Sequence, residues 1–89
     1  MRIFLTLPRN GKKIAIQCKR HSRSITNRAV QEVYAAKAYY NCSEAYVITN
    51  SEFTIPAKNL AKKLGVTLFN RHRLFTLIQK ANKNLKFTQ

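Results

Sequence analysis

Acidic residues are scarce in this chain, and aspartate is absent. Its 89 residues include 17 lysines and arginines against three acids, Glu32, Glu44 and Glu52, so the formal net charge is +14. A net positive charge of this size attracts polyanions and repels further copies of the chain. Nucleic acid is therefore the leading partner class. An anionic membrane surface ranks behind it, because no predicted helix combines a basic face with a continuous apolar face.

Long apolar runs and closely spaced cysteines are also missing. No run approaches the roughly 20 residues of a membrane span, and the apolar stretch at residues 3–7 is shorter than the core of a signal peptide. Cys18 and Cys42 lie far apart without CxxC spacing, which predicts two free thiols and gives no zinc motif. We therefore expect an intracellular, cytoplasmic protein. A hydrophobic content of 45% predicts a single folded domain over residues 1–89.

The apolar pattern and the turn signals predict the order strand, strand, helix, strand, helix, strand, helix. The strands fall near residues 2–7, 12–20, 45–49 and 66–69, and the helices near 26–40, 54–64 and 70–82. Asn10-Gly11 favours a tight hairpin between the first two strands. This order predicts an α/β fold with a mixed four-stranded sheet flanked by helices.

The second predicted strand carries the clearest candidate site. Side chains alternate between its faces, so one face carries the apolar Ile14, Ile16 and Cys18 while the other carries Ala15, Gln17 and Lys19. We expect the first face to be buried and the second to be exposed. An amide oxygen and an ammonium about 6–7 Å apart along the strand would suit a site that acts on phosphate. The alternative interpretation is an amphipathic strand with a solvated polar face.

Further segments follow this strand in a distinctive order. Ile16-Gln17-Cys18-Lys19-Arg20 precedes segments at residues 29–33 (AVQEV), 46–54 (YVITNSEFT), 57–61 (AKNLA) and 65–71 (GVTLFNR). In this order and spacing they resemble the catalytic domain of Mrr-type restriction endonucleases, over about residues 12–79. That family belongs to the PD-(D/E)xK nuclease superfamily, in a variant where Gln replaces the second acid. The resemblance implies a restriction endonuclease-like fold and Mg²⁺-dependent hydrolysis of DNA, with Gln17 and Lys19 as catalytic residues and Gln17 as a metal ligand.

The chain departs from this family at the metal site. The resemblance places the family's metal-binding Asp on the preceding strand, near Arg2, Ile3 or Phe4, and none of these is acidic. It also implies a preceding helix and strand that this chain lacks, so we expect an N-terminally truncated domain. Lys19 would repel Mg²⁺ with little to offset it. We therefore expect weak metal binding through Gln17 and impaired or lost cleavage.

Residues that could contact double-stranded DNA flank the candidate site. A basic run is expected around one end of the second strand, and a polar loop follows the third strand. Gln31 and Glu32 could point back toward the site, although solvent exposure is the simpler expectation for both. Glu32 or Glu52 could act as a substitute carboxylate. The nucleic-acid-binding candidates are Lys12, Lys13, Arg20, Arg23, Arg28, Asn50 and Ser51, and the accessory candidates are Gln31, Glu32 and Glu52.

Three functions stay open at this point. The chain could be a DNA-binding domain with lost activity, or an active Mg²⁺-dependent endonuclease completed by another carboxylate or by a partner chain. It could also be a small basic RNA-binding or ribosome-associated protein, although it carries no OB, KH or RRM signature. The apolar strand at residues 2–7 would form an unpaired sheet edge, which predicts a homodimer through residues 1–7.

Overall fold

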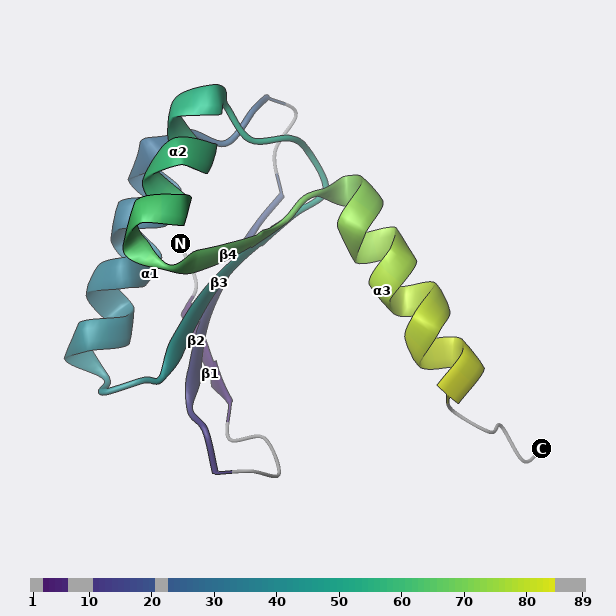
Figure 1. Cartoon of the computed structure of the whole chain (residues 1–89), viewed down its shortest axis with the longest axis horizontal. Coiled ribbons are helices and arrows are strands. Elements are labelled where there is room, and N and C mark those ends of the chain that lie inside the picture. Colours follow the sequence, from purple (N-terminus) through teal and green to yellow (C-terminus); the bar gives the residue numbers. More distant parts are fainter. Residues whose placement is uncertain (1–2, 7–10, 21–22, 85–89) are drawn as a thin grey trace.

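A computed structural model of the chain describes residues 3–6, 11–20 and 23–84. The first two strands are β1 (Ile3–Thr6) and β2 (Ile14–Lys19), and residues 2 and 7 of the predicted first strand lie outside the described residues. The predicted order of elements and the α/β class are confirmed (Figure 1). The remaining elements are α1 (Asn27–Tyr39), β3 (Glu44–Thr49), α2 (Ile55–Leu64), β4 (Val66–Phe69) and α3 (Arg71–Asn84).

The four strands form one mixed sheet in the order β1-β2-β3-β4. β1 runs antiparallel to β2. Of the predicted turn at Asn10-Gly11, only Gly11 is among the described residues, and it has a positive φ of 76° that glycine tolerates. β2, β3 and β4 are mutually parallel, so their carboxyl ends meet at one edge of the sheet. The loops that follow β2 and β3 are joined there, because Ser51 Oγ donates to the Arg23 carbonyl at 3.0 Å. Ligand contacts in open α/β sheets gather at this edge.

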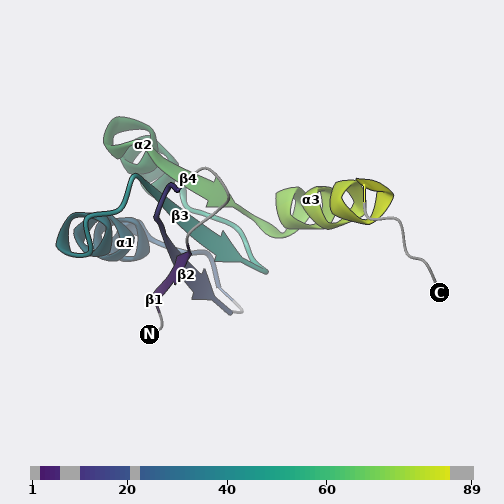
Figure 2. The ribbon, with the colours of Figure 1, turned by 90° about the horizontal axis from the view of Figure 1, so that it is seen from below.

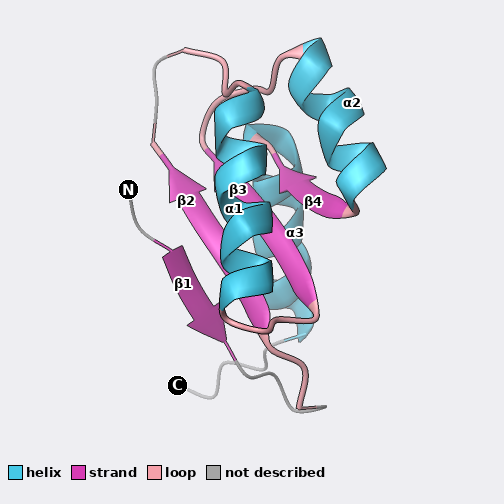
Figure 3. Ribbon diagram, turned by 90° about the vertical axis from the view of Figure 1, so that its left-hand side faces the viewer, coloured by secondary structure: helices cyan, strands magenta, loops and turns pink. Residues whose placement is uncertain are grey.

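α1 and α2 cover one face of the sheet (Figure 3). The core between them is built mainly from alanine and valine, which let the helices lie close to the parallel strands. On α1 the buried residues are Ala29, Val30, Val33 and Ala36. The helical spacing of Val30, Val33, Tyr34, Lys37 and Tyr40 predicts one buried stripe on this helix. That prediction is wrong in part, since Tyr34 and Tyr40 stay exposed: the small buried residues bring α1 close to the sheet, and rings on this face would hold it off.

The ends of the helices follow local sequence signals, with one difference. Thr54 caps α2 by accepting a backbone N–H bond of 3.2 Å, and Gly65 ends α2 with a φ of 72°. Asn70 caps α3 in the same way, with a bond of 2.8 Å. At α1 the capping position belongs to Thr26, whose side chain makes no capping hydrogen bond within the described part of the chain.

The second face of the sheet is more open. α3 leaves the end of β4 and projects away from α1 and α2 (Figure 2). Ile16, Tyr46 and Ile48 are half-buried on this face, and Phe75 of α3 is 59% exposed. Partial burial and then the nearby Glu44 carboxylate raise the pKa of Tyr46, so this face gains no negative charge from it at neutral pH. None of the described helices is long and apolar enough to span a membrane.

Candidate nucleic-acid interface

The candidate strand β2 turns Gln17 toward α1 rather than toward solvent. Gln17 and Ala15 are both fully buried, whereas Ile16 is half-buried and Cys18 is exposed. The predicted alternation of faces is right, but the predicted burial is reversed at these four positions. Only Ile14, at 8% exposure, is buried as expected. Both cysteines of the chain are free, as predicted.

Two features of the packing explain this reversal. Ala15 lets α1 approach the strand closely, and an isoleucine in its place would hold the helix off. The buried Gln17 amide is tolerated because it finds a hydrogen-bond partner, since its Nε2 donates to Glu32 Oε1 at 3.2 Å. The apolar face of β2 is less enclosed because α3 diverges from that side of the sheet.

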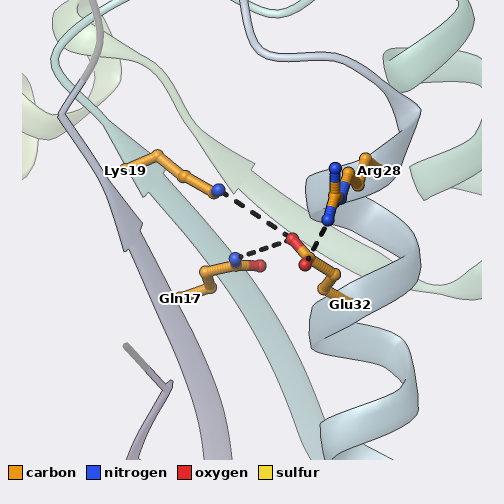
Figure 4. A network of polar contacts seen from close by, with 4 residues as sticks. All are labelled: Gln17, Lys19, Arg28 and Glu32. Carbon is orange, nitrogen blue, oxygen red and sulfur yellow. Dashed lines mark hydrogen bonds and ion pairs between the residues drawn. The ribbon is translucent and has the colours of Figure 1, made fainter. Parts of the chain in front are cut away.

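Glu32 is the centre of the polar network between β2 and α1 (Figure 4). Lys19 Nζ lies 3.9 Å from Glu32 Oε1, and Arg28 Nε lies 3.7 Å from Glu32 Oε2. The side chains of Lys19 and Glu32 are 27% and 20% exposed, so this pair is partly screened from water. The expectation of plain solvent exposure is therefore wrong for Glu32. The helix instead brings a carboxylate to the candidate pair of Gln17 and Lys19.

The donor set does not fit a resident Mg²⁺. Gln17 Oε1 is buried with no hydrogen-bond partner among the described residues, which by itself would suit a cation. No cluster of three His, Cys, Asp or Glu exists in that part of the chain, and Glu32 is the one carboxylate found beside Gln17 there. At an effective dielectric constant near 20, a divalent ion about 4 Å from a cationic side chain is repelled by roughly 8 kcal/mol. Glu32 offsets only one of the two neighbouring cations, Lys19 and Arg28.

The carboxyl edge of the sheet gathers most of the other candidates. Lys19, Arg23 and Arg28 line a cavity of about 410 Å³ between the end of β2 and the start of α1. Arg20 and Asn50 line a second depression of about 310 Å³ on the other side of the strand ends. Ser51 lies in the same region, where its backbone N–H donates to the side chain of Thr49 at 3.1 Å. The structure thus places these candidates along one edge.

Three candidates lie away from this edge, and a fourth, Glu52, lies at the edge but does not approach Gln17. Lys12 and Lys13 precede β2, at the opposite edge of the sheet, where Lys13 Nζ donates to the Tyr40 carbonyl at 2.9 Å. The predicted basic run around one strand end is therefore wrong, because a six-residue strand spans about 20 Å. Gln31 is exposed on α1, and Glu52 accepts a hydrogen bond from Asn70 Nδ2 at 3.0 Å rather than approaching Gln17.

The position of Glu32 could have been predicted from its spacing to the small residues of α1, which the predicted stripe leaves out. Glu32 lies three residues after Ala29 and four before Ala36, so it borders the stripe of small residues on α1. Arg28 stands four residues before Glu32, a spacing at which ion pairs form on a helix. Together these spacings indicate a carboxylate at the rim of the helix–sheet interface with a cation beside it.

Comparison with known proteins finds one matching family and solved structures with a similar fold. The family model for the Mrr catalytic domain, described as a restriction endonuclease, matches residues 3–78. No curated protein matches the chain. The solved structure of the DNA modification-dependent restriction endonuclease AspBHI is similar, with a TM-score of 0.70 and 16% identity over 91% of this chain and 26% of that one.

A second solved structure, of a protein of unknown function called AF1548, has a TM-score of 0.64. It is 18% identical over 79% of this chain and 47% of that chain. The chain therefore spans about half the length of one neighbour and about a quarter of the other. At these identities both likenesses bear on the fold alone, and the likeness to AspBHI supports a restriction endonuclease-like fold.

Proposed function

Because the chain belongs to the Mrr-type restriction endonuclease family, we propose that it binds double-stranded DNA and that its capacity to cleave DNA is impaired or lost. The observation that carries this proposal is the pairing of Glu32 with both Lys19 and Arg28. The three side chains sum to a charge of +1 where the family's chemistry requires hard anionic oxygens around Mg²⁺. The same positive sum favours a phosphate backbone.

The carboxyl edge of the sheet is the proposed DNA-binding surface. Lys19, Arg20, Arg23 and Arg28 follow or adjoin the end of β2, and Asn50 and Ser51 follow β3. Cations of this kind contact phosphates and fix the position of a duplex without reading its sequence. We therefore expect weak sequence preference. The formal net charge of +14 adds a long-range attraction for any nucleic acid.

A paired measurement of binding and cleavage tests this proposal. Purified protein is mixed with supercoiled plasmid in Mg²⁺ or Mn²⁺, and binding is followed by mobility shift while nicking is followed by gel. We expect a mobility shift at low salt and no nicking by the wild type or by Lys19→Ala. Absence of a shift would reject DNA binding, and metal-dependent nicking that disappears in Lys19→Ala would reject the loss of cleavage.

An active endonuclease is the second candidate, and one observation favours it. Glu32 Oε1 and the Gln17 amide lie 3.2 Å apart, so a helix carboxylate stands beside the QxK strand. Glu32 could then replace the missing aspartate as an oxygen ligand. Nicking that is lost in both Lys19→Ala and Glu32→Gln, but kept in the matched control Glu52→Gln, would establish this candidate in place of the first.

A further inference from the structure

The cavity between the end of β2 and the start of α1 has the charge of an anion site. Lys19, Arg23 and Arg28 line it together with a single carboxylate, Glu32, so these side chains sum to +2. Its volume of about 410 Å³ leaves room for a phosphate group with its bound water. A divalent ion would meet this excess of positive charge, whereas an anion would be attracted by it.

The ion pairs within the cavity are longer than charge-assisted hydrogen bonds. Lys19 and Arg28 approach Glu32 at 3.9 and 3.7 Å, whereas a charge-assisted N–H···O bond is about 2.7–2.9 Å long. The side chain of Arg28 is 84% exposed and approaches Glu32 through Nε. Its two Nη groups keep the fork geometry that binds a phosphate through two parallel hydrogen bonds. Both cations can therefore engage an anion without first losing a strong internal bond.

The start of α1 adds to this attraction. Its first turn contains no acidic residue, and the Thr26 side chain makes no capping bond among the described residues. α2 and α3 differ, since Thr54 and Asn70 accept backbone N–H bonds at their starts. The positive end of the α1 dipole thus faces the cavity with no acidic or capping side chain in the first turn of the helix. Behind it, the buried Gln17 amide holds Glu32 in place.

We propose that this cavity binds a phosphate group of a nucleic acid directly through Lys19, Arg23 and Arg28, with no divalent ion in between. The inference rests on the nucleic-acid binding proposed above and names its contact. The phosphate belongs either to a phosphodiester within a strand or to a strand's 5′ end. The cavity has three cations and one carboxylate. This excess of positive charge makes it unsuited to Mg²⁺ and, in this proposal, holds the DNA phosphate.

The first experiment uses inorganic phosphate as the probe. Amide chemical shifts of the ¹⁵N-labelled full chain are followed by NMR during a phosphate titration in EDTA, with ionic strength held constant by NaCl. We expect saturable shifts at Arg23, Arg28 and Ala29, with a midpoint at least fivefold weaker in Arg28→Gln. Lys62→Gln is the matched control, because Lys62 is exposed near the end of α2, at the amino edge of the sheet. Its midpoint should stay within twofold of the wild type.

Two results would overturn the inference. One is a set of shifts that does not saturate or that is the same in Arg28→Gln. The other is saturation that requires added Mg²⁺. Binding of 5′-phosphorylated and 5′-hydroxyl duplexes then separates the two sources of phosphate. Only a site for terminal phosphate distinguishes the two duplexes, while a phosphodiester site binds both equally and weakens equally in Arg28→Gln.

The duplex measurement also separates this inference from the proposed function. Duplex binding that is unchanged in Arg28→Gln would keep the DNA-binding function and reject this cavity as its contact. Absence of duplex binding would reject the function itself, even if inorganic phosphate still saturates the cavity.

Discussion

Both ends of β2 carry cations, but the two ends arrange them differently. At the carboxyl end, Lys19, Arg23 and Arg28 converge on a cavity that contains one carboxylate. At the amino end, Lys13 donates to the carbonyl of Tyr40 and so ties the start of the strand to the end of α1. A cation that closes a helix end stabilises the fold, whereas cations that converge on a cavity attract an external anion. Charge alone does not locate a binding surface.

The largest expected effect concerns the whole basic surface. If about five phosphates are contacted, log K for duplex DNA should fall with log salt at a slope near −4.5, because each contact releases counterions. Raising NaCl from 50 to 200 mM would then weaken binding by about 500-fold. Fluorescence anisotropy with a labelled duplex measures the slope. A slope near zero would contradict an electrostatic interface.

The next effect distinguishes the two ends of β2 directly. The double variant Arg23→Gln/Arg28→Gln should weaken duplex binding by about 30-fold and reduce the salt slope by about 2, since two phosphate contacts are lost. The matched variant Lys12→Gln/Lys13→Gln removes the same charge from the amino end and should weaken binding by less than about threefold. Anisotropy at one fixed salt concentration measures both. Equal losses in the two variants would mean that net charge, rather than the cavity, governs binding.

A smaller effect concerns stability at the carboxyl end. Glu32→Ala should lower the free energy of unfolding by about 1–2 kcal/mol, because it leaves the buried Nε2 of Gln17 without its acceptor. Glu52→Ala removes an exposed acceptor from Asn70 and should cost less than about 0.5 kcal/mol. Urea denaturation followed by circular dichroism compares the two variants. A stability loss no larger in Glu32→Ala than in Glu52→Ala would show that the network does not stabilise the helix–sheet contact.

The weakest expected effect is self-association through the edge of the sheet. β1 is the outer strand, and Leu5 is 40% exposed there, so we propose that a second copy pairs at this edge. Repulsion between two strongly basic chains opposes the contact, and added salt should strengthen it. Light scattering at tens of micromolar protein and high salt should give a dimer mass that Leu5→Lys reduces to a monomer. A monomer mass for the wild type would reject the contact.

The sequence predicts the features of this fold that depend on neighbouring residues. Thr54, Gly65 and Asn70 mark helix ends because capping and positive φ are decided within one turn of the chain. The antiparallel start and the parallel remainder of the sheet follow from a short connection between the first two strands and from the helices between the later ones. β2 has six residues and therefore spans about 20 Å. The length of a strand follows from its number of residues, so the distance between the two basic ends of β2 can be predicted from the sequence.

The features that sequence reasoning missed depend on packing between distant segments. Whether Gln17 or Ile16 faces α1 is decided by how closely the small residues of that helix approach the strand, which the alternation within β2 does not reveal. The contact between Gln17 and Glu32 joins residues 15 positions apart on different elements. Gln17 can be buried only because Glu32 accepts its hydrogen bond, so its burial and its partner must be predicted together.

We expect nucleic acid to bind this chain at the carboxyl edge of the sheet. The most direct test maps the amide chemical-shift changes that a short DNA duplex causes in the ¹⁵N-labelled chain, in EDTA and at moderate salt. We expect the largest changes at residues 19, 20 and 23–29 and at Asn50 and Ser51, with small changes at Lys12, Lys13 and Tyr40. Changes that are largest at the amino edge, or that spread evenly over the chain, would contradict it.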